Sequence, residues 1–187
     1  MNSKLPTSNF QLPTGFTLIE AMVAVTILTL SIAGPLVAAN SAFVASLIAR
    51  DRLTASYLAQ EGIEYVRAMR DKEFLTAYPS GDGWSVFKNG IEAYCRDSLC
   101  TLDPVLRQMG YGPGSALASC SGSCGKLHRR SDGVYTQQSI GEQTVFTRTI
   151  RVDDVSETDE RVISTVSWDY HGSSYFVTIT NNLTPWQ

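Results

Sequence analysis

The sequence is poor in histidine and in charged residues, and both shortages limit what the protein can do. It has only 2 histidines, and Asp, Glu, Lys and Arg make up 18% of it, below the roughly 25% of an average soluble domain. It lacks a G-x-S-x-G elbow, a P-loop and an H-E-x-x-H motif, so no spacing selects a catalytic set. We therefore expect neither an enzyme nor a cofactor. A net charge of −3 also gives no general support for nucleic-acid binding.

Charged residues are missing completely from one long stretch, Ala21–Ala49. As a helix this stretch is about 43 Å long, at roughly 1.5 Å per residue, and about 20 residues already cross the hydrocarbon core of a bilayer. A helix satisfies its own backbone in lipid, so Phe16–Ala39 is predicted to span a membrane. Pro35 removes one helical hydrogen bond and follows the flexible Gly34, which predicts a bend or a locally melted turn at these two residues.

One acidic residue, Glu20, lies near the start of this apolar segment. A secretory signal peptide cleaved after Ala39 and a plain signal anchor are two ordinary interpretations of the segment. Neither gives a purpose to Glu20, although an acidic residue in a span costs up to ~3 kcal/mol on insertion scales and less near an end. Both also require a basic leader, whereas residues 1–15 contain a single lysine. Arg50 and Arg52, after the span, weakly favour the reverse topology.

A third interpretation rests on the sequence Gly15-Phe16-Thr17-Leu18-Ile19-Glu20, which resembles the processing motif of type IV pilins and type II secretion pseudopilins. The resemblance implies that residues 1–15 are a leader and that a prepilin peptidase cleaves between Gly15 and Phe16. It also implies that the new amino group of Phe16 is methylated and that Glu20 pairs with this group on a neighbouring subunit. An α-amino group with a pKa of about 7.7–8 is largely cationic, and a buried carboxylate is tolerated when it is paired.

The resemblance further implies a structural role. The chain would be a subunit, with a minor one favoured, of a type IV pilus or a type II secretion-like filament. Its partners would be other pilin subunits of the same or different sequence, the prepilin peptidase, membrane lipid before assembly, and assembly platform proteins. It would wait in the cytoplasmic membrane as a single-pass protein with its head outside, and would end in an extracellular or periplasmic filament. The alternative is a secreted, disulfide-bonded adhesin or binding domain released by signal-peptide cleavage near Ala39.

The helix is predicted to continue beyond the membrane. Residues 16–49 form its membrane or filament-core half, and residues 50–75 form an amphipathic half. One apolar stripe follows helical spacing through Ala55, Leu58, Ala59, Gly62, Val66 and Met69. Small residues on this stripe allow close approach of a second layer, which we expect to be a β-sheet. The sequence Tyr78-Pro79-Ser80-Gly81-Asp82-Gly83 then ends the helix.

Residues 76–187 are predicted to form a β-rich head. Its irregular part, residues 84–130, is expected to hold short strands near Val86–Phe87 and Ile91–Tyr94. Alternation of apolar and polar residues predicts an antiparallel meander with strands at Thr144–Val152, Arg161–Trp168 and Tyr175–Leu183. The fold class is therefore α+β: a long N-terminal helix packed on a small antiparallel sheet, which is pilin-like.

The four cysteines form two close pairs, Cys95-x4-Cys100 and Cys120-x3-Cys124. Paired cysteines at this separation resemble a zinc ribbon, so a metal site is one interpretation. If the head lies outside the cytoplasmic membrane, two disulfides are favoured instead. Four cysteines allow three pairings, of which we prefer the two local bridges; crossed bridges remain the alternative.

Two charged clusters complete the candidates. A basic run follows the second cysteine pair, with Lys126, His128, Arg129 and Arg130 as its members. It could contact DNA or another surface ligand, but four basic residues are few for binding a polyanion, and a solvated loop is favoured. Five acidic residues crowd the predicted turn between residues 153 and 160. They could hold Ca²⁺, although their spacing fits no EF-hand and a solvated acidic turn is favoured.

Overall fold

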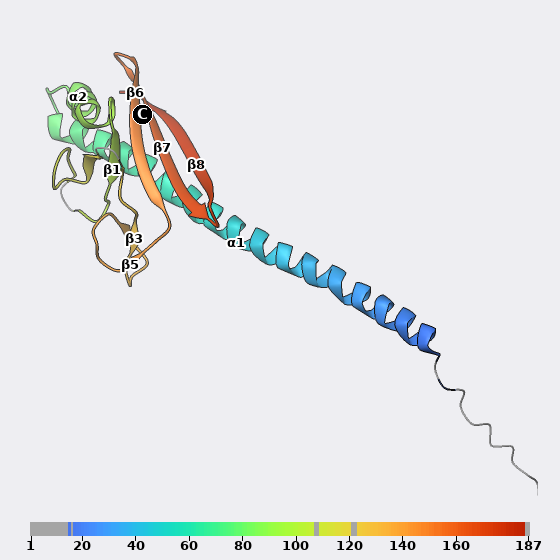
Figure 1. Ribbon diagram of the computed structural model, residues 1–187. Helices are drawn as coiled ribbons and strands as arrows, with labels where there is room; N and C mark the ends of the chain where they lie inside the picture. Colours follow the sequence, from blue (N-terminus) through green and yellow to red (C-terminus); the bar gives the residue numbers. More distant parts are fainter. Residues whose placement is uncertain (1–14, 16, 107–108, 121–122, 186–187) are drawn as a thin grey trace, which may run out of the picture. The chain divides into compact units, whose positions relative to one another are not determined.

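The structure is a computed structural model that describes residues 15, 17–106, 109–120 and 123–185. The chain divides between Ser46 and Leu47 into two units, which are described separately. Helix α1 (Leu18–Ala77) contributes residues to both of them. By its class the structure is the predicted α+β fold, with a long N-terminal helix and antiparallel sheets (Figure 1).

The N-terminal unit consists, in its described part, of the apolar turns of α1. They belong to the single helix of the described chain that is long and apolar enough to cross a membrane. Hydroxyl groups within it bond to carbonyl oxygens one turn earlier, as Ser31 Oγ does to Ile27 O at 2.7 Å. This pairing lets polar side chains stay in an apolar helix. Gly34 and Pro35 are both helical, and the bend proposed at these residues stays a prediction.

The C-terminal unit contains the second part of α1, whose apolar stripe is buried as predicted. All six residues of the stripe are buried, together with Ile63 and Arg70. Gly62 lies close against the sheet, because an added Cβ there would lie 2.6 Å from Ser164 Oγ. Figure 1 shows this part of α1 along one face of the sheet. The small residues therefore set the distance between the helix and the sheet.

A second helix, α2 (Gly83–Cys95), follows directly after the predicted break. The short strands expected at Val86–Phe87 and Ile91–Tyr94 are wrong, because both segments lie in this helix. Its buried residues Trp84, Phe87 and Ile91 are spaced as on one helical face. Asp82 caps its first turn and accepts a hydrogen bond from the N–H of Ser85 at 3.1 Å.

The main sheet has five antiparallel strands in the order β2-β1-β6-β7-β8. Strands β6 (Thr147–Ser156), β7 (Asp159–Tyr170) and β8 (Ser173–Leu183) are the predicted meander. Both links are tighter than expected, and the second is the two-residue turn His171-Gly172. The φ angles of these two residues are 50° and 81°, the positive values that such a hairpin turn requires. Strands β1 (Leu99–Leu102) and β2 (Leu117–Cys120) extend the sheet beyond β6.

A smaller antiparallel sheet has the order β4-β3-β5. Its strands are β3 (His128–Arg129), β4 (Tyr135–Thr136) and β5 (Glu142–Gln143). Leu127, just before β3, is fully buried in a cluster with Ala55 and Leu58 of α1 and with Trp168 of β7. The small sheet is thus anchored to the main core at this residue.

Candidate functional site

The predicted processing motif lies at the start of α1. Gly15 is exposed, and Phe16 and the leader residues 1–14 lie outside the described residues. Glu20 is in the first turn of the helix, and its N–H donates to Thr17 Oγ1 at 3.3 Å. Thr17-x-x-Glu20 thus makes one bond of a capping box, and an acidic residue here also suits the helix dipole. The Glu20 side chain is exposed and has no ion pair among the described residues.

A buried arginine, Arg148 of β6, links the sheet to α1. Its side chain is 0% exposed. Nη1 lies 2.5 Å from Glu61 Oε2 and donates to Leu58 O at 3.1 Å, and Nη2 donates to Leu102 O at 2.9 Å. Burial lowers the pKa of Arg148 from its ordinary value, and the neighbouring Glu61 carboxylate opposes that shift. The ion pair and the two carbonyl oxygens compensate for the burial of the guanidinium, which ties one helix to two strands.

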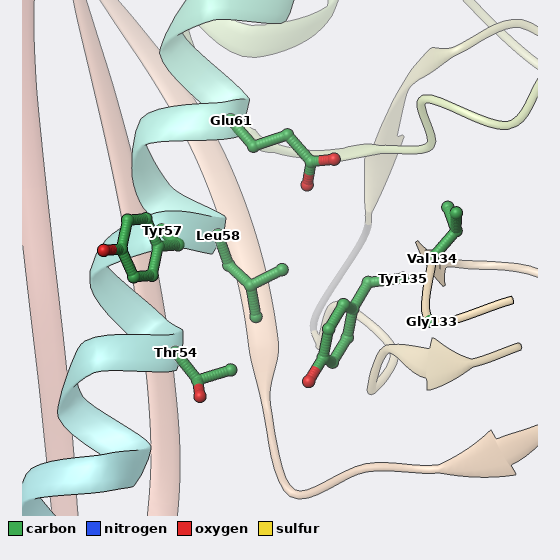
Figure 2. A pocket seen from close by; sticks show the side chains of 7 residues that line it. All are labelled: Thr54, Tyr57, Leu58, Glu61, Gly133, Val134 and Tyr135. Carbon is green, nitrogen blue, oxygen red and sulfur yellow. The ribbon is translucent and has the colours of Figure 1, made fainter.

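A groove of about 510 Å³ opens beside this ion pair. Leu58 and Glu61 of α1 face Tyr135 and Val134 across it (Figure 2). Thr136, which follows Tyr135 in the chain, donates a hydrogen bond from Oγ1 to the buried Asp103 at 3.0 Å, and Gln138 Nε2 donates to Asp103 at 3.2 Å. Asp103 follows β1, so these bonds fasten the small sheet to the main sheet. The groove has one charged group, Glu61, and that group is already paired.

A cluster of carboxylates surrounds Lys88 of α2. Lys88 Nζ lies 2.7 Å from Asp154 Oδ1, 3.8 Å from Glu92 Oε1 and 3.9 Å from Glu160 Oε2. It also donates to Ser156 O at 2.6 Å. One carboxylate oxygen from each acid lies within 4.8 Å of the others, a spacing suited to a cation, and the ammonium group lies among them. Part of the acidic turn is therefore a structural ion-pair cluster that joins α2 to the β6–β7 hairpin.

Within this cluster Glu160 is the most buried acid. Its side chain is 0% exposed and neither oxygen has a hydrogen-bond partner among the described residues. Burial and the nearby Glu92 carboxylate raise the pKa of Glu160 to about 8, and Lys88 limits the rise. The hydrogen bond from Lys88 holds the pKa of Asp154 below its ordinary value. Among the acids of this cluster, Glu160 therefore has the greatest tendency to hold a proton.

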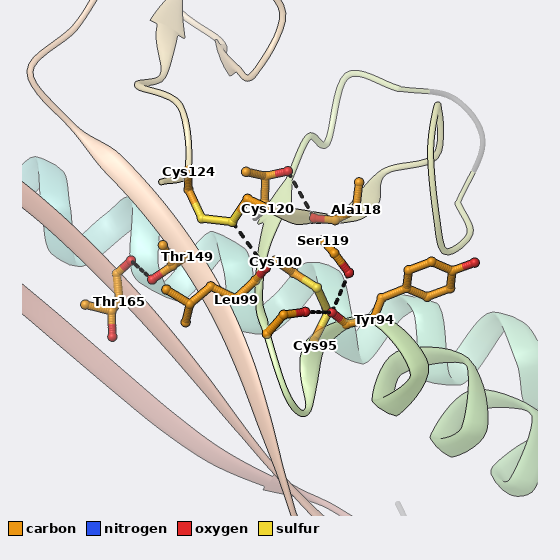
Figure 3. The surroundings of a disulfide bond; sticks show 12 residues. Tyr94, Cys95, Leu99, Cys100, Ala118, Ser119, Cys120, Cys124, Thr149 and Thr165 are labelled. Atoms are coloured by element: carbon orange, nitrogen blue, oxygen red, sulfur yellow. Dashed lines mark hydrogen bonds between the residues drawn. A yellow bond between two sulfur atoms is a disulfide. The ribbon is translucent and has the colours of Figure 1, made fainter. Parts of the chain in front are cut away.

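The cysteines lie at disulfide distance in the two local pairs that the sequence analysis preferred. Cys95 is bonded to Cys100 and Cys120 to Cys124, with Cα atoms 5.2 Å apart in each pair. The first bridge joins the last residue of α2 to β1 (Figure 3). The carbonyl of Tyr94 accepts hydrogen bonds from Ser98 Oγ and Ser119 Oγ, at 2.7 and 2.6 Å. These bonds satisfy the end of the helix, so bridge and hydroxyl groups together fix α2 on the sheet.

The predicted basic patch is divided by the fold. Lys126 and Arg129 are exposed, while His128 is half-buried in β3. Arg130 pairs with Asp132 at 3.1 Å, and Arg129 lies opposite Glu142 in the register of β3 and β5. Acidic groups therefore lie beside two of the four basic residues, and the preference for a solvated loop over a ligand patch stays a prediction.

Two parts of this chemistry were missed by the sequence analysis. Arg148 alternates with Phe146, Ile150 and Val152 on one face of a strand, so its burial and need for an acid were signalled by the pattern. The cluster around Lys88 had no such signal, because its members come from three elements. Comparison with family models, with curated proteins and with solved structures finds no match to this chain.

Proposed function

We propose that the chain is a structural subunit of a type IV pilus or a type II secretion-like filament, processed by a prepilin peptidase after Gly15. It waits in the cytoplasmic membrane as a single-pass protein and then enters the filament through its apolar helix. The lone acid Glu20 at the head of that helix carries the proposal. In lipid or in a helix bundle an unpaired carboxylate is costly. The α-amino group of Phe16 on a neighbouring subunit is a cation that could pair with it.

The fold supports this proposal. The apolar first part of the long helix is exposed, and its second part packs on an antiparallel sheet. A filament subunit needs both: an exposed apolar segment for contacts with other subunits, and a segment that holds the folded head. The exposed part includes Leu18, Ile19 and Leu30, each more than 70% accessible. In a filament these side chains pack against other subunits, and before assembly they face lipid, so apolar surface stays out of water in both states.

The capping geometry gives Glu20 a second, purely local use. A glutamine at this position leaves the backbone bond to Thr17 in place and suits the last position of a capping box as glutamate does, but it removes the charge. The two uses therefore separate by substitution. Glu20→Gln abolishes subunit pairing and leaves the helix start intact, whereas Thr17→Ala weakens the helix start by about 1 kcal/mol and keeps the charge.

The experiment measures filament incorporation of the full chain in cells that make the rest of the assembly machinery. We expect Glu20→Gln and Glu20→Ala to be made, inserted and cleaved, yet to be absent from sheared filaments. Thr17→Ala is expected to be incorporated. Normal incorporation of Glu20→Gln would mean that assembly does not need the charge of Glu20, and the pairing proposal would then fail.

A further inference from the structure

Strand β8 forms an open edge of the main sheet. It pairs with β7 over all eleven of its residues, from Ser173 opposite Tyr170 to Leu183 opposite Glu160, and with no other described strand. In Figure 1 it is the outermost strand of the sheet. Along such an edge, alternate residues direct their backbone N–H and C=O groups away from the sheet, and these groups can accept another strand.

The opposite edge of the sheet is covered at one end of its strand, β2. Beyond β2, the segment 110–112 runs beside Leu117 and is joined to it by a parallel bridge at Tyr111. Gly112 N–H donates to Leu117 O at 2.8 Å, and Leu117 N–H donates to Gly110 O at 3.3 Å. The chain therefore covers the start of β2 with its own segment 110–112, whereas β8 has no such cover among the described residues.

Strand β8 also lacks the features that usually protect an open edge. Its sequence, SSYFVTITNNL, contains no charged residue and no proline. Its register with β7 is unbroken, so no bulge twists it away, whereas β6 and β7 do have an irregularity near Asp154. A long, regular and uncharged edge strand is a surface for strand pairing.

Several apolar side chains of β8 are incompletely buried along this edge. Tyr175, Val177 and Ile179 pack against the core clusters but are only half-buried, because no strand lies beyond them. On the other face of β8, Phe176 is 69% exposed. An added strand would cover apolar surface on both faces as well as pair the backbone groups.

We propose that β8 is a dimerisation surface on which a second copy of this chain pairs its own β8 in antiparallel orientation, centred on Thr178. The proposal goes beyond the filament role and does not depend on it. An antiparallel pair centred at Thr178 overlaps all eleven residues and keeps each side chain on its own face of the joined sheet.

The strand is complementary to itself in this register. Val177 lies opposite Ile179 of the second copy, on the core face of both sheets. Phe176 lies opposite Thr180 on the outer face, and cross-strand pairs of aromatic and β-branched residues are stabilising. With no charge in β8, the pairing brings no like charges together. The two-fold axis makes the contact identical for both copies and closes the assembly at two.

The test uses the full chain in detergent micelles, with its molar mass measured by light scattering over a range of concentrations. We expect the unsubstituted chain to dimerise. Thr178→Lys places two ammonium groups against each other at the two-fold axis and is expected to raise the dimer dissociation constant by at least about tenfold. Thr165→Lys is the matched control, because Thr165 lies beside Thr178 in strand β7, one strand further from the second copy, and loses the same hydroxyl–hydroxyl contact of 2.9 Å.

Cross-linking then fixes the register. The described cysteines are all in disulfides, so an introduced cysteine supplies the one free thiol among the described residues. Thr178→Cys is expected to cross-link to itself with a short thiol-specific reagent, and Thr165→Cys is expected not to. A monomeric chain, or a dimer that Thr178→Lys leaves intact, would overturn the proposal. Binding of an extended segment of another protein to a monomeric chain would likewise overturn it and assign that occupant to the edge.

Discussion

At the scale of single residues, Arg148 shows how the head is held together. Its guanidinium is buried among two carbonyl oxygens and the Glu61 carboxylate, whose own side chain is 40% exposed. A buried cation without its partners is strongly unfavourable, whereas an ion pair replaced as a whole by apolar groups can be nearly neutral. The arrangement therefore predicts unequal effects of removing one partner, the other, or both.

We predict that Arg148→Ala lowers the free energy of unfolding by about 3–5 kcal/mol, and that Glu61→Gln lowers it by about 1–3 kcal/mol. Arg148→Met combined with Glu61→Leu is expected to cost less than the sum of the single changes. Urea unfolding in mild detergent measures these values, with fluorescence of the buried Trp84 and Trp168 as the signal. Additive losses would show that the two side chains do not act as a pair.

Glu160 predicts a dependence of stability on pH. Its pKa is raised from an ordinary 4.5 to about 8 by burial and by Glu92, with Lys88, Asp154 and Arg96 as the other charged groups around the cluster. The folded state therefore holds a proton that the unfolded state releases. Its favourable contribution is complete below about pH 4.5 and is lost as the pH rises through about 8.

Between about pH 4.5 and pH 8, we expect the ionisation of Glu160 to lower the free energy of unfolding by an amount on the order of 2 kcal/mol. Glu160→Gln, which has nearly the same size but cannot ionise, is expected to remove that fall. Glu157→Gln, in the exposed turn between β6 and β7, is the matched control. Equal pH profiles for Glu160→Gln and the unsubstituted chain would refute the assignment.

At the scale of elements, the sequence predicted those helices and strands in which a periodic pattern of apolar residues repeats over many positions. The stripe of α1 and the alternation of β6, β7 and β8 extend over many residues, so both were identified with near-correct bounds. Helix α2 was missed because pairs of adjacent apolar residues, such as Val86–Phe87, suggested strands. The capping residue Asp82 and the spacing of Trp84 and Phe87 were the better signals. Strands β1 to β5 have two to four residues each and depend on distant partners, so no local pattern defines them.

Contact between α1 and the sheet gives a prediction at the same scale. Gly62→Leu inserts a side chain where an added Cβ already meets Ser164 Oγ at 2.6 Å and Ile150 Cδ1 at 3.0 Å. We expect it to lower the free energy of unfolding of the head by about 1–3 kcal/mol or more. Gly34→Leu, on the same helix, has nothing within 4 Å of an added Cβ and is the control. The same urea experiment compares the two variants, and an equal effect of both would contradict close packing at Gly62.

At the scale of the whole molecule, the chain combines an apolar helical segment with a head that has its own core. The sequence was sufficient to predict this division, because charge disappears from one stretch and returns with periodic patterns. The candidate site was harder. Glu20 and its neighbours form a local motif that can be recognised in the sequence. The partner of the Glu20 carboxylate would lie on another copy of the chain, and the residue spacing within one copy does not identify it.

The filament account depends on where the mature chain begins. Its most direct test is the mass of the N-terminal peptide of the protein purified from its native membrane. The account predicts a chain that begins at Phe16 and has one added methyl group on its α-amino nitrogen. A chain that begins at Asn40, or that keeps residues 1–15, would contradict it.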